Sequence, residues 1–467
     1  MPAQAVSPSP PLTHAQVETF LRDGVLVVPV LTVEEIEKAR QGLHSHLKAA
    51  AGVDVDNLEE TAGALRQLSS TNGSGGVLDV FYPPFKLDLI QHPLIFAIMS
   101  QLWAATFGVF SEDKSACCQQ LYRHRHGSFD AKRGFAYIDR VGFRVPSRIA
   151  ALHADMPATT KQKKKRGKAR LLQRSLTPHL DCCPDHLYDH MQGGKVVRKW
   201  RPLQAFAALS DTLHPDEGGF EAALGFHRDF DAWTHQRQKG HVNQATAFHG
   251  TPEIPTSQTI PPRPPSTGSL AAPCVGEFTP IRPREDNEVL RRITPVPCRA
   301  GDLVIWDNRI PHANSRENRP FEATTTLQQI QNEGHATGAF DSSIPTPSSQ
   351  TEKYSYLESM NRERVREVVY LGFLPDVPLN RHFVAEQLAR FRAGLSPNDQ
   401  WHEGQVSLST QALNTSKLEQ HFTELGRKLM GIDLWEDNEK KNDMVWKKDS
   451  HIEGPSTSNE IRAANGI

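Results

Sequence analysis

The sequence Gly301-Asp-Leu-Val-Ile-Trp-Asp-Asn-Arg-Ile-Pro-His-Ala-Asn-Ser-Arg-Glu-Asn-Arg-Pro320 joins an apolar run to a histidine and two arginines. The run Leu303–Trp306 follows a Gly-Asp turn and is short and bounded by polar residues, which is typical of a buried strand. The chain then turns and reaches His312, with Arg316 and Arg319 shortly after it. A single histidine after a strand is more often structural than a ligand, so its role depends on a second stretch.

That second stretch is Leu176-Thr-Pro-His-Leu-Asp181, in which a histidine and a carboxylate lie two residues apart. In an extended segment, residues two apart point to the same face. Two imidazoles and one carboxylate on one side of a metal ion, with the other positions open, are typical of non-haem Fe(II) oxygenases. We therefore predict that His179, Asp181 and His312 bind one Fe(II) ion.

The start of the chain carries a second ordered pattern. Thr13 is expected to cap a short helix that ends at Asp23-Gly24, and Val25–Val30 to form a strand. Thr32 and Glu35 form a capping box for a second helix. This opening, followed by His-x-Asp and then by Gly-Asp…His…Arg in the same order, resembles the phytanoyl-CoA dioxygenase family of Fe(II)/2-oxoglutarate-dependent oxygenases.

The resemblance covers residues 13–330, with an echo near residues 420–435. It implies a mainly β fold with flanking helices, built on a double-stranded β-helix (a jelly-roll or cupin-like core). It also implies an activity: hydroxylation of a small-molecule or lipid-like substrate, with 2-oxoglutarate and O₂ consumed and succinate and CO₂ released. The prime substrate is not implied, because no acyl-CoA-binding signature is present.

The resemblance further implies a cation for the co-substrate. 2-Oxoglutarate chelates the metal through its 2-oxo acid end, and its far carboxylate then pairs with an arginine fork. The family places that arginine about ten residues after the second histidine, where this chain has Glu322 and Ala323. We assign the role to Arg319, expected to point into the barrel beside the metal, with Arg316 as the reserve.

Other residues are weaker candidates for the pocket, and packing or surface roles are equally expected for them. Gln204 and Phe206 lie on a predicted strand, Trp200–Leu209, that lines the co-substrate pocket in the resembled family. Thr177 and Asn314 flank the expected ligands.

Two arginines and one histidine complete the candidates. Arg140 and Arg144 lie on a predicted core strand, Ala136–Pro146, from which they could reach an anionic substrate. Leu224-Gly-Phe-His227 is a variant of a Pro-Gly-Ser-His-like turn of the family, so we interpret His227 as structural or pocket-lining. Cys182 and Cys183, beside Asp181, are expected to be small buried residues.

The remaining sequence divides the chain into segments. Residues 159–175 contain a basic run from Lys161 to Arg170, and residues 236–292 are rich in Pro, Thr, Ser and Gln. Both are predicted to be surface loops inserted in one barrel, because neither can bury enough apolar surface to offset the entropy of ordering. The predicted segments are a disordered N-terminus at 1–12, an oxygenase domain at 13–330 that ends with a return strand at Glu322–Ile330, a helical extension at 331–435 with helices at Tyr354–Leu371, Arg381–Phe391 and Lys417–Met430, and a disordered tail at 436–467.

Composition and net charge limit the kinds of binding partner and the cellular location that we expect. The 467 residues are 38% hydrophobic and carry a net charge of −1, so bulk charge favours neither nucleic acid nor an acidic membrane. No apolar run approaches the roughly 20 residues that span a bilayer. Two adjacent pairs among the six cysteines do not resemble a disulfide framework. We expect an intracellular, cytoplasmic protein acting on a small molecule; the basic run leaves a nuclear location open, and the oligomeric state is left open too.

Three function classes follow from this pattern. The first is the Fe(II)/2-oxoglutarate oxygenase. The second is a catalytically inactive jelly-roll protein that binds a ligand or a partner. The third is a Zn²⁺ hydrolase with the same three ligands and a bound water, disfavoured because no general base accompanies them.

Overall fold

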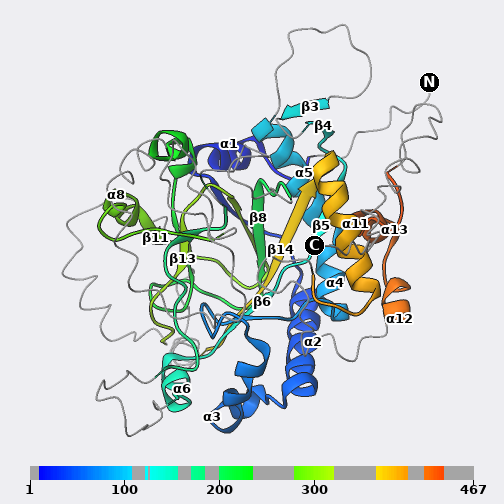
Figure 1. Ribbon diagram of the computed structural model, residues 1–467. Helices are drawn as coiled ribbons and strands as arrows, with labels where there is room; N and C mark the ends of the chain where they lie inside the picture. The colour runs from blue at the N-terminus through cyan, green and yellow to red at the C-terminus, as the bar shows by residue number, and fades with distance from the viewer. Residues whose placement is uncertain are drawn as a thin grey trace, which may run out of the picture. The chain divides into compact units, whose positions relative to one another are not determined.

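Two antiparallel sheets pack face to face, and helices cover the outer side of the larger one (Figure 1). The computed structural model describes residues 10–107, 121–124, 127–155, 170–182, 184, 199–234, 278–319, 364–397 and 415–435. Within these ranges, no helix combines the length and the apolar character needed to cross a membrane.

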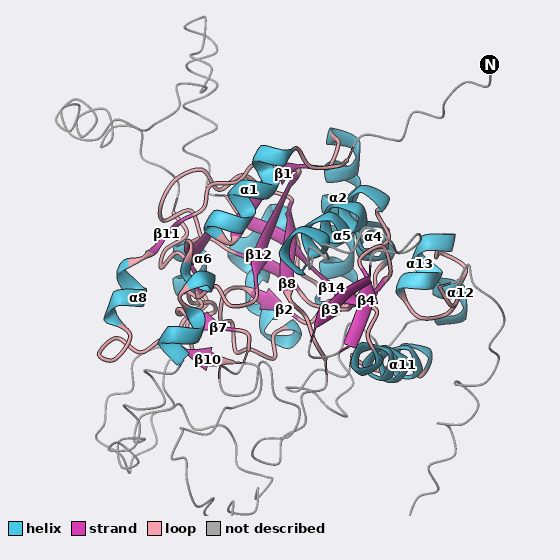
Figure 2. Ribbon diagram, turned by 90° about the horizontal axis from the view of Figure 1, so that it is seen from above, coloured by secondary structure: helices cyan, strands magenta, loops and turns pink. Residues whose placement is uncertain are grey.

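Helices precede, separate and follow the strands along the described part of the chain, and Figure 2 shows them around the sheets. They are α1 (His14–Asp23), α2 (Val33–Ala51), α3 (Leu58–Thr61), α4 (Pro84–Ile90), α5 (Pro93–Phe107), α6 (Ser147–Leu152), α8 (Asn287–Arg291), α11 (Pro378–Arg392), α12 (Thr415–Glu419) and α13 (Glu424–Leu429), with the 3-10 turns η1 (Val55–Asn57), η2 (Ala62–Leu68) and η4 (Phe226–Arg228).

The strands belong to three sheets. They are β1 (Val25–Pro29), β2 (Val77–Leu78), β3 (Leu121–His124), β4 (Gly127–Asp130), β5 (Gly134–Tyr137), β6 (Val141–Arg144), β7 (His179–Leu180), β8 (Leu203–Ala208), β9 (Phe220–Ala223), β10 (Thr279–Pro280), β11 (Ile293–Pro295), β12 (Asp302–Asp307), β13 (His312–Asn314) and β14 (Arg366–Pro375). The larger sheet runs β1-β12-β8-β14-β6-β2, with β5 also paired to β14, and the smaller runs β10-β7-β13-β9-β11. β3 and β4 form a separate hairpin.

The strand predicted behind Gly301-Asp302 is confirmed as β12, which pairs with β1 on one side and β8 on the other. Gly301 has φ 95°, a left-handed conformation that favours glycine. Its carbonyl accepts hydrogen bonds from the amides of Val30 and Leu31, and its amide donates to Ala208. The Gly-Asp turn therefore ties the first strand of the chain to the centre of the sheet.

The core between the sheets is apolar and draws on both. Phe206, Trp306 and Val368 come from the larger sheet, and Phe220 and Ala222 from the smaller, all at most 3% exposed. Apolar burial of this kind is the main force holding the sheets together.

The predicted opening of the chain is confirmed. Thr13 caps α1 and Thr32 caps α2, each in a reciprocal capping box, and Gly24 ends α1 in the left-handed region. These features depend on residues within one helical turn, which is why the sequence alone predicts them.

The helix predicted over Tyr354–Leu371 is wrong in its described part, because β14 begins at Arg366. β14 pairs with β8 on one side and with β5 and β6 on the other, so the predicted helical extension contains a core strand. Its Val-Val-Tyr-Leu centre is β-branched and aromatic, and pairing on both edges favours a strand. The return strand predicted at Glu322–Ile330 lies outside the described residues.

Two further elements are split. The strand predicted over Ala136–Pro146 is two strands, β5 and β6, separated by a turn whose carbonyls at Asp139 and Arg140 accept hydrogen bonds from the buried Lys86 ammonium. The helix predicted over Lys417–Met430 is α12 and α13, the second capped by Thr423. The third predicted helix is confirmed as α11.

The insertion predicted over residues 236–292 is shorter than expected at its C-terminal end. Phe278 and the residues after it are described, and β10 extends the small sheet beside β7. Trp233, which precedes the insertion, donates a hydrogen bond to the Asp286 carboxylate at 3.1 Å. This bond ties the two ends of the insertion together. The basic insertion also ends early, since Leu172 and Gln173 are buried.

Asn380 links α11 to the segment that enters β8. The side chain is fully buried; its amide oxygen accepts from the Trp200 amide at 2.7 Å, and its nitrogen donates to the carbonyls of Trp200 and Pro375 at 3.0 and 2.8 Å. We expect Asn380→Ala to lower the free energy of unfolding by about 2–4 kcal/mol, because three backbone groups lose their partner. Urea titration measures this, with exposed Asn57→Ala as the control; equal small effects would contradict it.

Candidate metal centre

The three predicted ligands converge. His179 begins β7 and His312 begins β13, and the two residues are directly paired across the ladder between these strands. Asp181 follows β7, and one ligand atom from each residue lies within 4.8 Å of the other two. The Asp181 carboxylate oxygens are 3.3 Å from His179 Nε2 and 3.4 Å from His312 Nε2. Two distant parts of the chain therefore build one donor cluster.

Backbone carbonyls fix both imidazoles. His179 Nδ1 donates to Thr177 O at 2.8 Å, and His312 Nδ1 donates to Ile310 O at 3.0 Å. Each Nδ1 thus carries the ring proton, which leaves the Nε2 lone pair for a metal. Such outer contacts orient metal-bound histidines and set their tautomer.

Aromatic rings surround the histidines. Phe278 stacks on His179 with ring centroids 4.9 Å apart, and Trp306 and Phe220 lie 5.2 and 5.7 Å from His312. His179 is 2% exposed and His312 6%, whereas the Asp181 side chain is 30% exposed. Solvent and small molecules therefore reach the cluster from the carboxylate side.

The electrostatics suit a cation. Burial acts to raise the pKa of the Asp181 carboxyl, but its contacts with the His179 and His312 imidazoles hold that pKa well below its usual value. Burial and the neighbouring His179 lower the pKa of His312, although the contact with Asp181 acts to raise it. At neutral pH the carboxylate is charged and His312 is neutral, which are the forms that bind metal.

This donor set fits a divalent first-row ion. Imidazole and carboxylate together suit iron and zinc, and three ligands on one side leave positions open for small molecules. The structure thus supports a metal site without selecting the metal.

Neither predicted arginine is buried. The Arg319 side chain is 65% exposed and lies 3.4 Å from Glu317. Its amide donates to Asp216 O, which holds this residue in a surface turn. Arg316 is also exposed, and it contributes its carbonyl as an acceptor for Arg144. The expectation that Arg319 points into the barrel is therefore wrong in this geometry.

Arg366 is a buried arginine that the sequence analysis missed. Arg366 is 2% exposed, and neither its Nη1 nor its Nη2 atom has a hydrogen-bond partner among the described residues. The guanidinium lies 5.3 Å from the Phe206 ring, which packs against Phe220 and Trp306 beside His312. It was missed because its segment was predicted to be a helix; the β-branched and aromatic run Val368-Val-Tyr370 was the available signal for a strand.

The remaining candidate residues differ in burial and in their hydrogen-bond partners. Gln204 is buried and donates to Asn308 Oδ1 at 2.6 Å, and Phe206 lies in the core. Asn314 is buried, and its side-chain oxygen has no partner among the described residues. Thr177 is exposed and contributes only its carbonyl to His179.

Arg140, Arg144 and His227 are held by neighbours. Arg140 Nε donates to Asp79 at 2.8 Å, and Arg144 donates to the carbonyls of Ser315 and Arg316 at 2.5 and 2.7 Å. His227 Nε2 donates to a carbonyl of α1. These contacts support structural roles.

The adjacent cysteines are less informative. Cys182 is buried, with its thiol 3.5 Å from Asn308 O. Cys183 lies outside the described residues.

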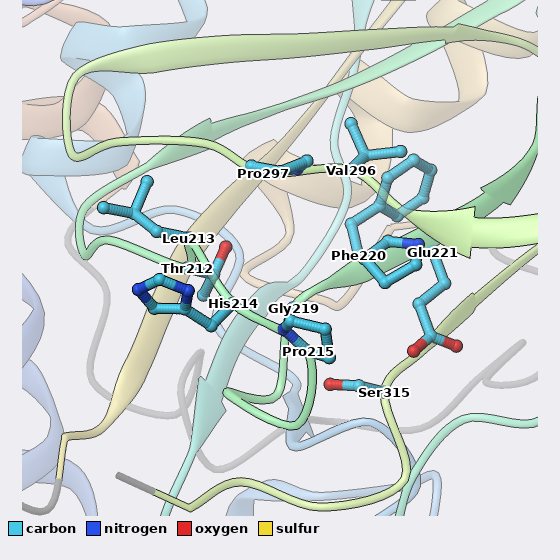
Figure 3. Close-up of a pocket in the computed structure, with 11 residues that line it drawn as sticks. Thr212, Leu213, His214, Pro215, Gly219, Phe220, Glu221, Val296, Pro297 and Ser315 are labelled. Atoms are coloured by element: carbon cyan, nitrogen blue, oxygen red, sulfur yellow. The ribbon is translucent and has the colours of Figure 1, made fainter. Parts of the chain in front are cut away.

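A small hollow lies between residues 212–215, 219–221 and 295–297 (Figure 3). Its lining includes His214, Glu221 and Ser315 with three prolines. Burial and the charge of Asp216 raise the pKa of Glu221. The hollow contains none of the metal-binding candidates, so it is not the centre described above.

Asp181→Ala should weaken Co(II) or Fe(II) binding at least about 100-fold, since losing even an outer partner of a ligand costs 10–100-fold. Metal titration by calorimetry under anaerobic conditions measures this effect. Asp56→Ala, at an exposed position, is the control and should bind as the wild type does. Unchanged affinity in the Asp181 variant would refute the ligand assignment.

His312 predicts how the stability of the metal-free protein depends on pH. Its pKa is lowered from 6.5 in the fold, so below pH 6.5 the unfolded chain binds a proton that the native protein does not. Stability should therefore fall with decreasing pH there, by at most about 1.4 kcal/mol per pH unit. Urea unfolding at pH 7.5 and 5.5 should show a larger loss for the wild type than for His312→Gln. Equal losses would contradict the lowered pKa.

Comparisons with known proteins bear on the fold. No protein-family model and no curated protein matches this chain. Among solved structures, GlcNAc Inducible Gene 2 (GIG2, DUF1479) from Candida albicans matches with a TM-score of 0.52 and 15% identity, over 93% of this chain and 78% of that one. The hypothetical protein JW0805 from Escherichia coli gives 0.52 and 12%, over 90% and 82%. Such likeness shows a shared fold alone, and the resemblance to the phytanoyl-CoA dioxygenase family stays a prediction.

Proposed function

We propose that this chain is an Fe(II)- and 2-oxoglutarate-dependent oxygenase that hydroxylates a small-molecule or lipid-like substrate. The observation that carries the proposal is the pairing of two features in one interior. One is the His179, Asp181 and His312 cluster, and the other is the buried guanidinium of Arg366, whose Nη1 and Nη2 have no hydrogen-bond partner among the described residues.

The order of the strands supports a double-stranded β-helix as the scaffold. In that fold two four-stranded antiparallel sheets face each other, and strands alternate between them along the chain. Here β7, β9, β11 and β13 lie in the small sheet, and β6, β8, β12 and β14 in the large one. Each successive strand in this series, apart from the β9–β11 pair of the small sheet, crosses to the opposite sheet. The arrangement carries the first and second histidines to neighbouring strands.

Arg366 has the properties of an anchor for a carboxylate. A buried charge is costly unless it is paired, so a guanidinium without a partner favours a bound anion. The fork binds a carboxylate through two parallel hydrogen bonds. Arg366 begins the strand that follows β13 among the described residues, so it takes the position expected for Arg319.

Two donor groups, the Arg366 guanidinium and the Tyr370 hydroxyl, lie near each other beside Gly142. A Cβ atom built on this glycine would lie 3.4 Å from Arg366 Nη1, 3.2 Å from the Tyr370 hydroxyl and 2.7 Å from a Val368 methyl. Two donors thus converge over a bare backbone carbon. The Val368 methyl closes the space over this carbon itself, but a carboxylate held in front of the two donors would accept from both, as the far end of a dicarboxylate co-substrate would.

Each residue then has a defined part. His179, Asp181 and His312 would hold the iron, and Arg366 and Tyr370 would hold the far carboxylate of 2-oxoglutarate. A bound iron would supply the redox chemistry by which O₂ converts 2-oxoglutarate to succinate and CO₂ and hydroxylates the substrate, one oxygen atom entering succinate and the other the product. The packed Phe206, Phe220 and Trp306 exclude water from one side of the reacting centre.

Arg366→Met should raise the 2-oxoglutarate concentration needed for half-maximal turnover by about two orders of magnitude or more, since a buried charge pair is lost. Arg319→Ala, at an exposed position, is the matched control and should change it by less than about threefold. Succinate formation at a series of 2-oxoglutarate concentrations measures both, with iron content determined in parallel.

The opposite ranking of the two variants would return the anchor to Arg319. Absence of succinate formation by the iron-loaded wild type across a panel of substrates would contradict the oxygenase proposal. Retained 2-oxoglutarate binding in that case would favour the ligand-binding alternative.

A further inference from the structure

Glu367, next to Arg366, is a buried carboxylate that the proposed chemistry does not use. Consecutive strand residues point to opposite faces, so Arg366 faces the core between the sheets and Glu367 faces α2. The Glu367 side chain is 1% exposed. Its oxygens accept from Arg40 Nε at 2.9 Å and from His44 Nε2 at 2.6 Å. Both partners lie one turn apart on α2 and are partly exposed.

The same residue is fixed through its backbone. The Glu367 amide donates to the Ser210 hydroxyl at 2.8 Å, and its carbonyl accepts from the Leu209 amide at 2.9 Å. On the other edge, Arg366 is paired with Arg144 of β6. The start of β14 is therefore held by α2 on its outer face and by strands on both edges.

We infer that Glu367 is a positioning residue that sets the register and direction of Arg366. A slip of one residue would exchange the faces, placing Arg366 under α2 and Glu367 in the interior. In that register the carboxylate would face the incoming anion and Arg366 would face Arg40. The contacts of Glu367 with Arg40 and His44 of α2 thus specify that the guanidinium faces inward. This inference rests on the proposed function of Arg366.

The inference predicts an effect on 2-oxoglutarate that spares the metal. In Arg40→Met the buried Glu367 carboxylate loses one of its two side-chain partners. It can reach water or a new donor only if the first residues of β14 shift, and Arg366 shifts with them. We expect the dissociation constant for 2-oxoglutarate to rise about 10- to 100-fold, as small displacements of binding groups do. The affinity for Co(II) alone should stay within about threefold, because no ligand residue touches α2.

A second variant separates positioning from general damage. In Arg40→Met/Glu367→Gln no unpaired carboxylate is left between β14 and α2, so 2-oxoglutarate affinity should recover to within about threefold of the wild type. A residue that only stabilises the fold would instead show additive losses. Arg148→Met removes a comparable ion pair, with Glu59 at 2.6 Å, but both of its members are exposed. It is the matched control and should change neither affinity.

The experiment is calorimetric titration of the full chain, first with Co(II) and then with 2-oxoglutarate on the Co(II)-loaded protein. If Arg40→Met does not fold, His44→Gln applies the same test with a smaller expected rise. Unchanged 2-oxoglutarate affinity, parallel loss of Co(II) and 2-oxoglutarate affinity, or no recovery in the double variant would overturn the inference. A wild type that binds Co(II) but no 2-oxoglutarate would instead refute the proposed function.

Discussion

The ladder between β7 and β13 is the constraint on which the candidate centre depends. It pairs His312 with His179, and the other edge of β13 pairs His312 with Ala222 of β9. Because β13 has a neighbour on both sides, a shift in register would break two ladders at once. The carbonyls of Thr177 and Ile310 that orient the rings belong to the same backbone segments. Ring position and ring tautomer are consequently set by one arrangement of strands.

Features that depend on neighbouring residues could be predicted from the sequence. The capping boxes at Thr13 and Thr32 need only a hydroxyl and a polar side chain three residues later. The His-x-Asp of β7 needs only the period of an extended chain to place both groups together. His312 could be predicted as the second histidine ligand because it follows a Gly-Asp turn and an apolar strand. Each of these rules depends only on nearby residues. The three metal ligands were predicted by combining such patterns with their order along the chain.

Arg366 could not be predicted in the same way. Its burial depends on β8 and β6, which precede it by more than a hundred residues, and its own segment suits either a helix or a strand until those edges are available. The spacing rule that pointed to Arg319 assumes a short connection after His312. In this chain Arg319 is fixed in a turn by Asp216, and the strand that completes the sheet begins far later. A cation needed inside a fold can be supplied from any strand that passes the site.

The contacts at the two ends of the central insertion have a practical meaning for engineering. Trp233 and Asp286 are hydrogen-bonded, and Phe278 rests on His179, so the chain leaves and rejoins the scaffold at fixed points. The cost of closing a loop between fixed points grows slowly with its length. Residues 235–277 are thus a natural place to graft a reporter domain or an affinity tag. Because Phe278 stacks on His179, the C-terminal junction of such a graft lies beside the candidate metal centre.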